Sequence, residues 1–324
     1  MAVGGGTGLS ALLRGLKHHV GTDGIRKLTG VVTVTDDGGS SGRLRREFGV
    51  LPPGDIRNCL VALADDEDLL ARLFQYRFPN GGGLLGHSFG NLFLTALTGI
   101  TGDFHQAILT AESILSVRGK ICPATVHDVR LRGRGVSGRI YEGESEVGLS
   151  GEELAAVEID PPAPPAFPPA VAALESADLI LLGPGSLYTS ILPNLLIPGI
   201  RQAITKARAR TILLLNLMTQ PGETDGMMGT AHLQALERHV GRGFVDAVLV
   251  NSSEIPPQLI RHYAETGSEP VTCQRDELEA LGVEVLEADL LAVDQDLIRH
   301  DPEKLAEAVL GLMEREGAGE QSGT

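Results

Sequence analysis

The chain of 324 residues has no tryptophan and only 4% aromatic residues, and its three cysteines, Cys59, Cys122 and Cys273, lie far apart. No two of them form a CxxC pair, which argues against a zinc site or a disulfide framework and favours reduced thiols. No apolar run approaches the roughly 18 residues that a membrane-spanning helix needs. No export signal opens the chain. We therefore expect a cytoplasmic protein that does not insert into a membrane.

Positive charge is scarce as well, because 27 Lys and Arg face 42 Asp and Glu for a net charge of −15. Such a surface repels nucleic acid and anionic membranes, so neither is an expected partner. An anionic ligand would have to be held by local glycine loops and arginines against this field. A chain of 324 residues can bury one large core or two modest ones, and we predict a single domain over residues 1–324.

Glycine, by contrast, is abundant at 41 residues and clustered. In one cluster, β-branched residues predict a strand over Val31–Thr35, which Asp36 and Asp37 follow directly. The loop Gly38–Gly42 comes next, and Arg43 opens a run of arginines. Two acids and a glycine nest at the end of a strand predict the floor of a phosphate-bearing ligand site. The alternative is a solvated turn with both acids as helix caps.

A second cluster lies at the start of the chain, where Met1–Val3 looks like a short strand, Gly4–Ser10 a loop and Ala11–Leu16 a helix. Strand, glycine loop and helix form a phosphate-binding unit, because glycines let the backbone approach and the helix N-terminus is partly positive. It is not a Walker A loop, and the third glycine of a dinucleotide fingerprint comes one position early, at Gly8. The alternative is a tight strand-to-helix turn.

Two further stretches offer polar side chains near glycines. Gly86–Gly90 matches the G-x-S-x-G elbow of serine hydrolases, but that reading needs a buried strand directly before Ser88. Glycines, proline and asparagine precede it, so we favour a ligand-lining loop in which His87, Ser88 and Asn91 offer hydrogen bonds. His87 could instead be a satisfied structural histidine. Arg57 and its neighbour Asn58 face either the site or water.

The second half of the chain repeats a strand, loop and helix rhythm. Apolar runs over 177–182, 211–217 and 247–251 suit parallel strands buried on both faces. We predict an α/β fold, Rossmann-like, with three αβα layers around a mainly parallel sheet. Three further features are expected: an inserted antiparallel hairpin region at about 122–150, a proline-rich connector at about 158–170 and a disordered tail over 317–324.

With these residues assembled, the chain resembles the gluconeogenesis factor family, the YvcK-like proteins, which are distantly related to the 2-phospho-L-lactate transferases (CofD-like). The motifs that carry the resemblance are Gly4–Ser10, Asp36–Leu44, Pro52–Asn58, Gly86–Asn91, Gly183–Ser186 and Arg299–Asp301. It implies a cytoplasmic protein that binds UDP-sugars such as UDP-N-acetylglucosamine and UDP-glucose, with a role in cell shape and wall synthesis during gluconeogenic growth. Arg299 matches the family arginine implicated in UDP-sugar binding, although it could simply pair with Asp301 at the surface.

We predict a regulator that binds its ligand without turnover, because no residue stands out as a nucleophile or base. The alternative is a metal-dependent transferase of the 2-phospho-L-lactate transferase type, in which Asp36 and Asp37 would hold magnesium. A serine hydrolase through Ser88 is a third, disfavoured reading. We also expect a homo-oligomer, a dimer that uses the hairpin region. The predicted ligand-binding residues are Gly5, Gly6, Thr7, Gly8, Asp36, Asp37, Gly38, Ser40, Ser41, Arg43, Asn58, His87, Ser88, Asn91, Gly185, Ser186, Asn216 and Arg299.

Overall fold

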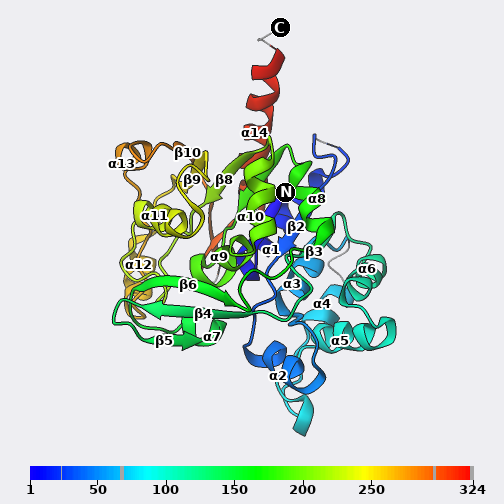
Figure 1. Cartoon of the computed structure of the whole chain (residues 1–324). Coiled ribbons are helices and arrows are strands. Elements are labelled where there is room, and N and C mark those ends of the chain that lie inside the picture. Colours follow the sequence, from blue (N-terminus) through cyan, green and yellow to red (C-terminus); the bar gives the residue numbers. More distant parts are fainter. Residues whose placement is uncertain (23, 66–68, 295–296, 322–324) are drawn as a thin grey trace.

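The computed structural model describes residues 1–22, 24–65, 69–294 and 297–321. Its centre is a seven-stranded sheet in the order β10-β9-β8-β7-β1-β2-β3, and every pair in it is parallel (Figure 1). The strands are β1 (Ala2–Gly4), β2 (Thr29–Val32), β3 (Lys120–Pro123), β7 (Leu179–Leu182), β8 (Arg210–Leu214), β9 (Ala247–Asn251) and β10 (Glu284–Ala288). The chain runs outward from β1 to β3 and then returns to β7 beside β1. The switch point of the topology, where open α/β sheets bind ligands, is therefore the gap between β1 and β7.

The sheet is buried on both faces, and successive side chains along a strand enter two different cores. Val32 packs into the core on one face and Val31 into the core on the other. Leu181 and Ile180 in β7 divide in the same way. Side chains of a strand alternate between faces, so a strand made only of apolar residues can fill two cores at once. This confirms the predicted α/β fold of Rossmann type.

Helices cover both faces. The first core is covered by α1 (Gly6–Leu16), α3 (Gly54–Leu63), α4 (Leu69–Gln75), α5 (Phe89–Thr101), α6 (Phe104–Ile114), α12 (Pro257–Ala264) and α14 (Pro302–Gln321). The second is covered by α8 (Pro168–Glu175), the π-helix η3 (Leu187–Ile191), α9 (Leu192–Leu195), α10 (Pro198–Lys206), α11 (Gly229–Val240) and α13 (Arg275–Glu279). Two short 3₁₀ turns are η1 (Lys17–His19) and η2 (Gly82–Leu84). No helix among the described residues is both long enough and apolar enough to cross a bilayer.

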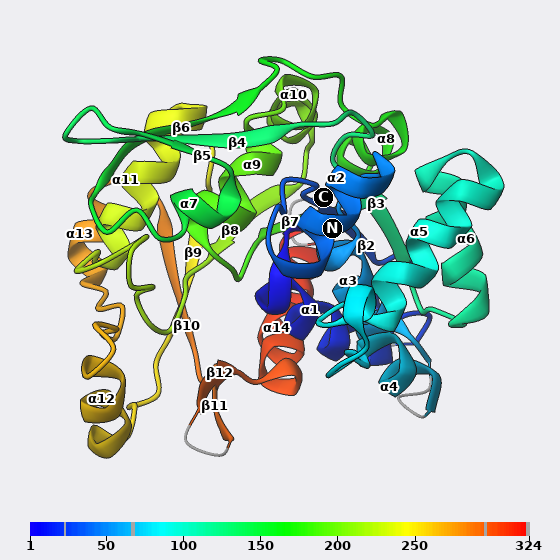
Figure 2. The same cartoon turned by 90° about the horizontal axis from the view of Figure 1, so that it is seen from below.

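A small antiparallel sheet is inserted between β3 and β7. In it β4 (Arg130–Gly135) pairs with β5 (Ile140–Glu142) on one side and with β6 (Leu154–Asp160) on the other, and α7 (Glu144–Val147) follows β5. Both views place this sheet beside α9 and α11, away from α5 and α6 (Figures 1 and 2). Its strands span 130–160 rather than the expected 122–150, because residues up to Pro123 pair with β2 in the main sheet. Since β6 ends at Asp160 and α8 begins at Pro168, only residues 161–167 connect them.

Two local expectations were wrong. The strand predicted over Val31–Thr35 ends at Val32, because its neighbour β1 ends at Gly4 and no strand remains to pair with. The residues predicted as a glycine nest instead begin the helix α2 (Gly39–Phe48). The helix α14 extends to Gln321 and so overlaps the predicted tail, whose disorder stays a prediction. Residues 322–324 lie outside the described part of the chain. A hairpin of β11 (Leu291–Asp294) and β12 (Leu297–His300) precedes α14.

Candidate functional site

The two glycine loops at the switch point touch. A Cβ atom added to Gly8 would lie 2.7 Å from the carbonyl carbon of Pro184 and 3.1 Å from the Cα of Gly185. A Cβ added to Gly185 would lie 3.5 Å from the carbonyl oxygen of Gly5. The helix α1 begins at this contact, and no side chain caps it at Gly5. A helix N-terminus beside backbone-lined loops favours an anion such as a phosphate.

Three carboxyl groups crowd the same edge of the sheet, contributed by Asp36 after β2, Asp55 in the first turn of α3 and Glu144 in α7. Burial, and then repulsion by Asp36, raise the pKa of Asp55 to about 7, although a hydrogen bond from the backbone N–H of Gly6 opposes the rise. Burial, followed by repulsion from Asp55 and Asp36, also raises the pKa of Glu144 well above its usual range. Burial and mutual repulsion therefore disfavour the ionised forms of Asp55 and Glu144.

Asp37 lies against the residues on either side of Glu144, and its charge adds to the rise in the pKa of Glu144. Its Oδ1 accepts hydrogen bonds from the backbone N–H of Ser145 at 2.9 Å and from the Ser145 hydroxyl at 2.7 Å. Asp37 thus links the inserted antiparallel sheet to the turn that follows β2. Asp36 instead accepts from the N–H of Gly38 at 2.9 Å, so the two adjacent acids have different hydrogen-bond partners. The described residues contain no group of three or more His, Cys, Asp or Glu side chains placed to hold a metal ion.

A buried arginine, Arg57 in α3, organises the other predicted polar residues. It donates to the Ser88 hydroxyl at 2.6 Å and to the side-chain oxygen of Asn91 at 3.1 Å through Nη1, and to the side-chain oxygen of Asn58 at 2.6 Å through Nη2. The amide of Asn91 in turn donates to the Ser41 hydroxyl at 3.3 Å. Helices α2, α3 and α5 are thereby joined by a single polar network, which burial strengthens.

The serine-hydrolase reading is wrong, because Ser88 is a helix cap. Its hydroxyl is fully buried and accepts from the backbone N–H of Asn91 at 3.1 Å, at the start of α5. The elbow needs a strand before the serine and an exposed hydroxyl, whereas here a 3₁₀ turn precedes it. The neighbouring His87 bonds to the Ser40 hydroxyl at 2.9 Å instead, and burial lowers the pKa of its imidazole. Arg43 donates to the carbonyl of Leu85 at 2.6 Å and holds the same loop.

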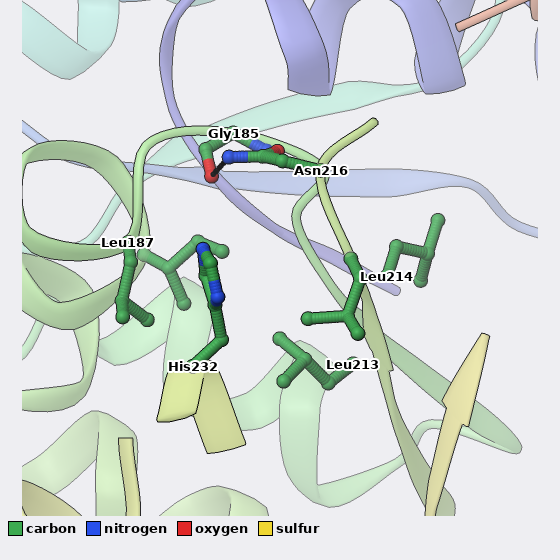
Figure 3. A pocket seen from close by; sticks show the side chains of 8 residues that line it. Gly185, Leu187, Leu213, Leu214, Asn216 and His232 are labelled. Carbon is green, nitrogen blue, oxygen red and sulfur yellow. Dashed lines mark hydrogen bonds between the residues drawn. The ribbon is translucent and has the colours of Figure 1, made fainter. Parts of the chain in front are cut away.

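The loop after β7 is held by side chains that follow β8. The amide of Asn216 pairs twice with Gly185, accepting from its N–H at 3.1 Å and donating to its carbonyl at 3.0 Å (Figure 3). Gln220 donates to the hydroxyl of Ser186 at 2.7 Å. The side chain of Asn216 therefore satisfies the backbone N–H and carbonyl of Gly185 beyond the end of the sheet, and these two hydrogen bonds hold the glycine loop in place.

Arg299 lies on the hairpin of β11 and β12. It is exposed on β12, opposite Ala292, and the described structure gives its guanidinium no hydrogen bond or ion pair. The next residue, His300, bonds through Nε2 to the carbonyl of Leu215 at 3.2 Å, which anchors the hairpin beside Asn216. Asp301 does not pair with Arg299; its carboxylate accepts from the backbone N–H groups of residues 303 and 304 at the start of α14.

The structure thus brings the predicted residues to one edge of the sheet, with Arg299 on its margin, and which of them bind a ligand stays a prediction. Sequence reasoning missed Asp55 and Glu144 as parts of the acidic cluster. Asp55 follows two prolines and a glycine, which indicated only a helix start. Glu144 carries no local signal, because it comes from the inserted sheet, more than 100 residues away from Asp36.

Fold and site define a class, doubly wound α/β proteins with glycine loops at the switch point. The family described as "2-phospho-L-lactate transferase CofD" matches residues 1–291. The "Gluconeogenesis factor" of Bacillus subtilis is 47% identical over 310 residues, which cover 96% of each chain. The "Putative gluconeogenesis factor" of a Nostoc species is 50% identical over 312 residues, 96% of this chain and 67% of that protein. A crystal structure of a Bacillus halodurans protein superposes with a TM-score of 0.91 at 46% identity, covering 95% of this chain and 98% of that one. The chain belongs to the CofD family and, within it, to the gluconeogenesis factors.

Proposed function

We propose that this protein is a cytoplasmic UDP-sugar-binding regulator that acts without turnover on cell shape and wall synthesis during gluconeogenic growth. The observation that carries the proposal is the contact between the loop at the start of α1 and the loop 183–186 at the switch point. A pyrophosphate at this position would meet a helix N-terminus and two backbone-lined loops. The names of the relatives support the link to gluconeogenesis.

The polar residues of the edge support binding rather than catalysis. Ser88 and His87 are buried and hold loops together, and Asp37 is engaged by Ser145. An activated nucleophile instead needs a neighbouring base and access to the substrate. In this proposal Arg299 supplies the guanidinium that pairs with the pyrophosphate from the hairpin side.

The negative charge of the cluster formed by Asp36, Asp55 and Glu144 would repel a bound diphosphate unless a proton or a cation neutralised part of it. A proton on Asp55 or Glu144 would reduce the repulsion, in line with the raised pKa values of both groups. Magnesium would have the same effect, and it commonly takes one or two carboxylates and completes its shell with phosphates and water. Asp36 is the better candidate ligand, because Asp37 is engaged by Ser145.

Isothermal titration with UDP-N-acetylglucosamine and UDP-glucose tests the proposal. Each titration is run once with magnesium and once with EDTA, and ³¹P NMR of the mixture detects any turnover. We expect saturable binding and unchanged ligand. The variant Arg299→Ala should lose ~1–3 kcal/mol of binding free energy if a charge-assisted contact is removed. Its matched control is Arg261→Ala, which removes an exposed arginine from α12. Absence of binding to any UDP-sugar would refute the proposal.

The second candidate is a metal-dependent transferase, which the carboxyl cluster and the name of the matching family favour. The protein would be incubated with magnesium, a deazaflavin acceptor and a nucleotide-activated lactate. A phosphodiester product would overturn the regulator proposal. Loss of that product in Asp36→Asn would assign the reaction to this site.

A further inference from the structure

A small cavity lies against the pair formed by Gly185 and Asn216. Its volume is about 10 Å³. The residues that line it are Gly185, Leu187, Ile191, Leu213, Leu214, Leu215, Asn216 and His232. The imidazole of His232 extends from α11 toward Gly185 and Asn216, while the labelled leucines surround it (Figure 3). A polar ring therefore enters a largely apolar space directly behind the glycine loop.

His232 presents an unfilled hydrogen-bond acceptor to this cavity. Its side chain is 2% exposed, and its Nδ1 lies 3.0 Å from the carbonyl oxygen of Met228. A carbonyl only accepts, so Nδ1 carries the proton and the neutral ring leaves a lone pair on Nε2. Among the described residues Nε2 has no partner. Burial lowers the pKa of His232, in keeping with a neutral ring.

The neighbouring pair offers partners for a bridging molecule. The Gly185 carbonyl accepts from Asn216, and the Asn216 side-chain oxygen accepts from Gly185, which leaves each oxygen a second lone pair. A molecule that donates two hydrogen bonds could therefore join Nε2 to one of these oxygens. The cavity has room for one water molecule, which needs on the order of 10–15 Å³ by this measure.

We propose that the cavity binds one buried water molecule, which donates one hydrogen bond to Nε2 of His232 and the other to the Gly185–Asn216 pair. His232 is then a positioning residue for the loop 183–186, since the water ties α11 to the loop. The proposal does not depend on which ligand the loop binds, or on whether it binds one.

Two measurements on the unaltered protein test it. A high-resolution crystal structure should show water density within hydrogen-bonding distance of Nε2. The ¹⁵N spectra of the histidine side chains should show His232 protonated on Nδ1 only at neutral pH. An empty cavity, or a ring protonated on Nε2, would overturn the proposal.

Variants test the positioning role. His232→Leu removes the acceptor, and His232→Gln keeps an acceptor oxygen. We expect the Gly185 amide to exchange with solvent about tenfold faster in His232→Leu, with partial rescue in His232→Gln. His262→Leu, which removes an exposed histidine from α12, is the matched control. If Gly185 exchanges no faster in His232→Leu than in the control, relative to amides of β8, His232 does not position the loop. If His232→Leu does not fold, the two measurements on the unaltered protein still decide the water site.

Discussion

Gly8→Ala tests whether the two glycine loops touch. The new methyl group would overlap the carbonyl oxygen of Pro184 and lie 2.7 Å from its carbonyl carbon. These are backbone atoms, so a loop must move. Overpacking of this kind typically costs ~1–3 kcal/mol, against a gain of ~0.5–1 kcal/mol for alanine over glycine in a helix. The two ranges leave a net loss of up to ~2.5 kcal/mol in the free energy of unfolding, and we expect weaker UDP-sugar binding because the loop is displaced.

The matched control is Gly99→Ala in α5. A Cβ there would meet nothing within 4 Å, so only the helix-propensity gain should remain. Urea unfolding of the wild type and both variants measures stability, and titration with UDP-N-acetylglucosamine measures affinity. A Gly8→Ala protein that gains as much stability as Gly99→Ala would show that the loops are not in contact. Lost stability with unchanged affinity would place the ligand elsewhere on the molecule.

Further predictions concern the polar network, the acidic cluster, the reactivity of Ser88 and assembly. Arg57→Ala should lower the free energy of unfolding by several times ~1 kcal/mol, measured in urea, because it removes a donor from three buried or half-buried acceptors, of which Ser88 keeps the N–H of Asn91. The folded-state pKa of Asp55, about 7 against an ordinary 3.8, means that the folded protein binds more protons than the unfolded chain between these values. The Asp55 contribution to stability is thus present at low pH and lost as the pH rises toward 7. Asp55→Asn should therefore gain stability relative to wild type between pH 4 and 7; a constant difference would contradict the shift. A fluorophosphonate should leave Ser88 unlabelled, checked by mass spectrometry. Sedimentation should show a dimer that Ile140→Asp, at an exposed position of the inserted sheet, dissociates; a monomeric wild type would refute the predicted dimer.

Much of the parallel sheet was predictable because its signals are local. Continuous apolar runs such as 177–182 and 211–217 indicate strands buried on both faces, and a glycine cluster marks where the first of these strands ends. The bounds of the strands were less predictable, because a strand ends where its neighbour ends. The strand expected to reach Thr35 stops at Val32 for this reason.

The sequence by itself determined the elements of this protein and the chemistry of its loops: backbone-lined turns, a pair of adjacent acids and a fold in which strand ends share one edge. Only the tertiary structure decided which of these groups meet. Asp37 lies next to Asp36 in the chain but turns to Ser145, while Glu144 joins Asp36 and Asp55 from the inserted sheet. The physical reason is that side-chain periodicity reflects burial on one element, whereas contacts between elements depend on strand order and crossovers, which leave no trace in local sequence.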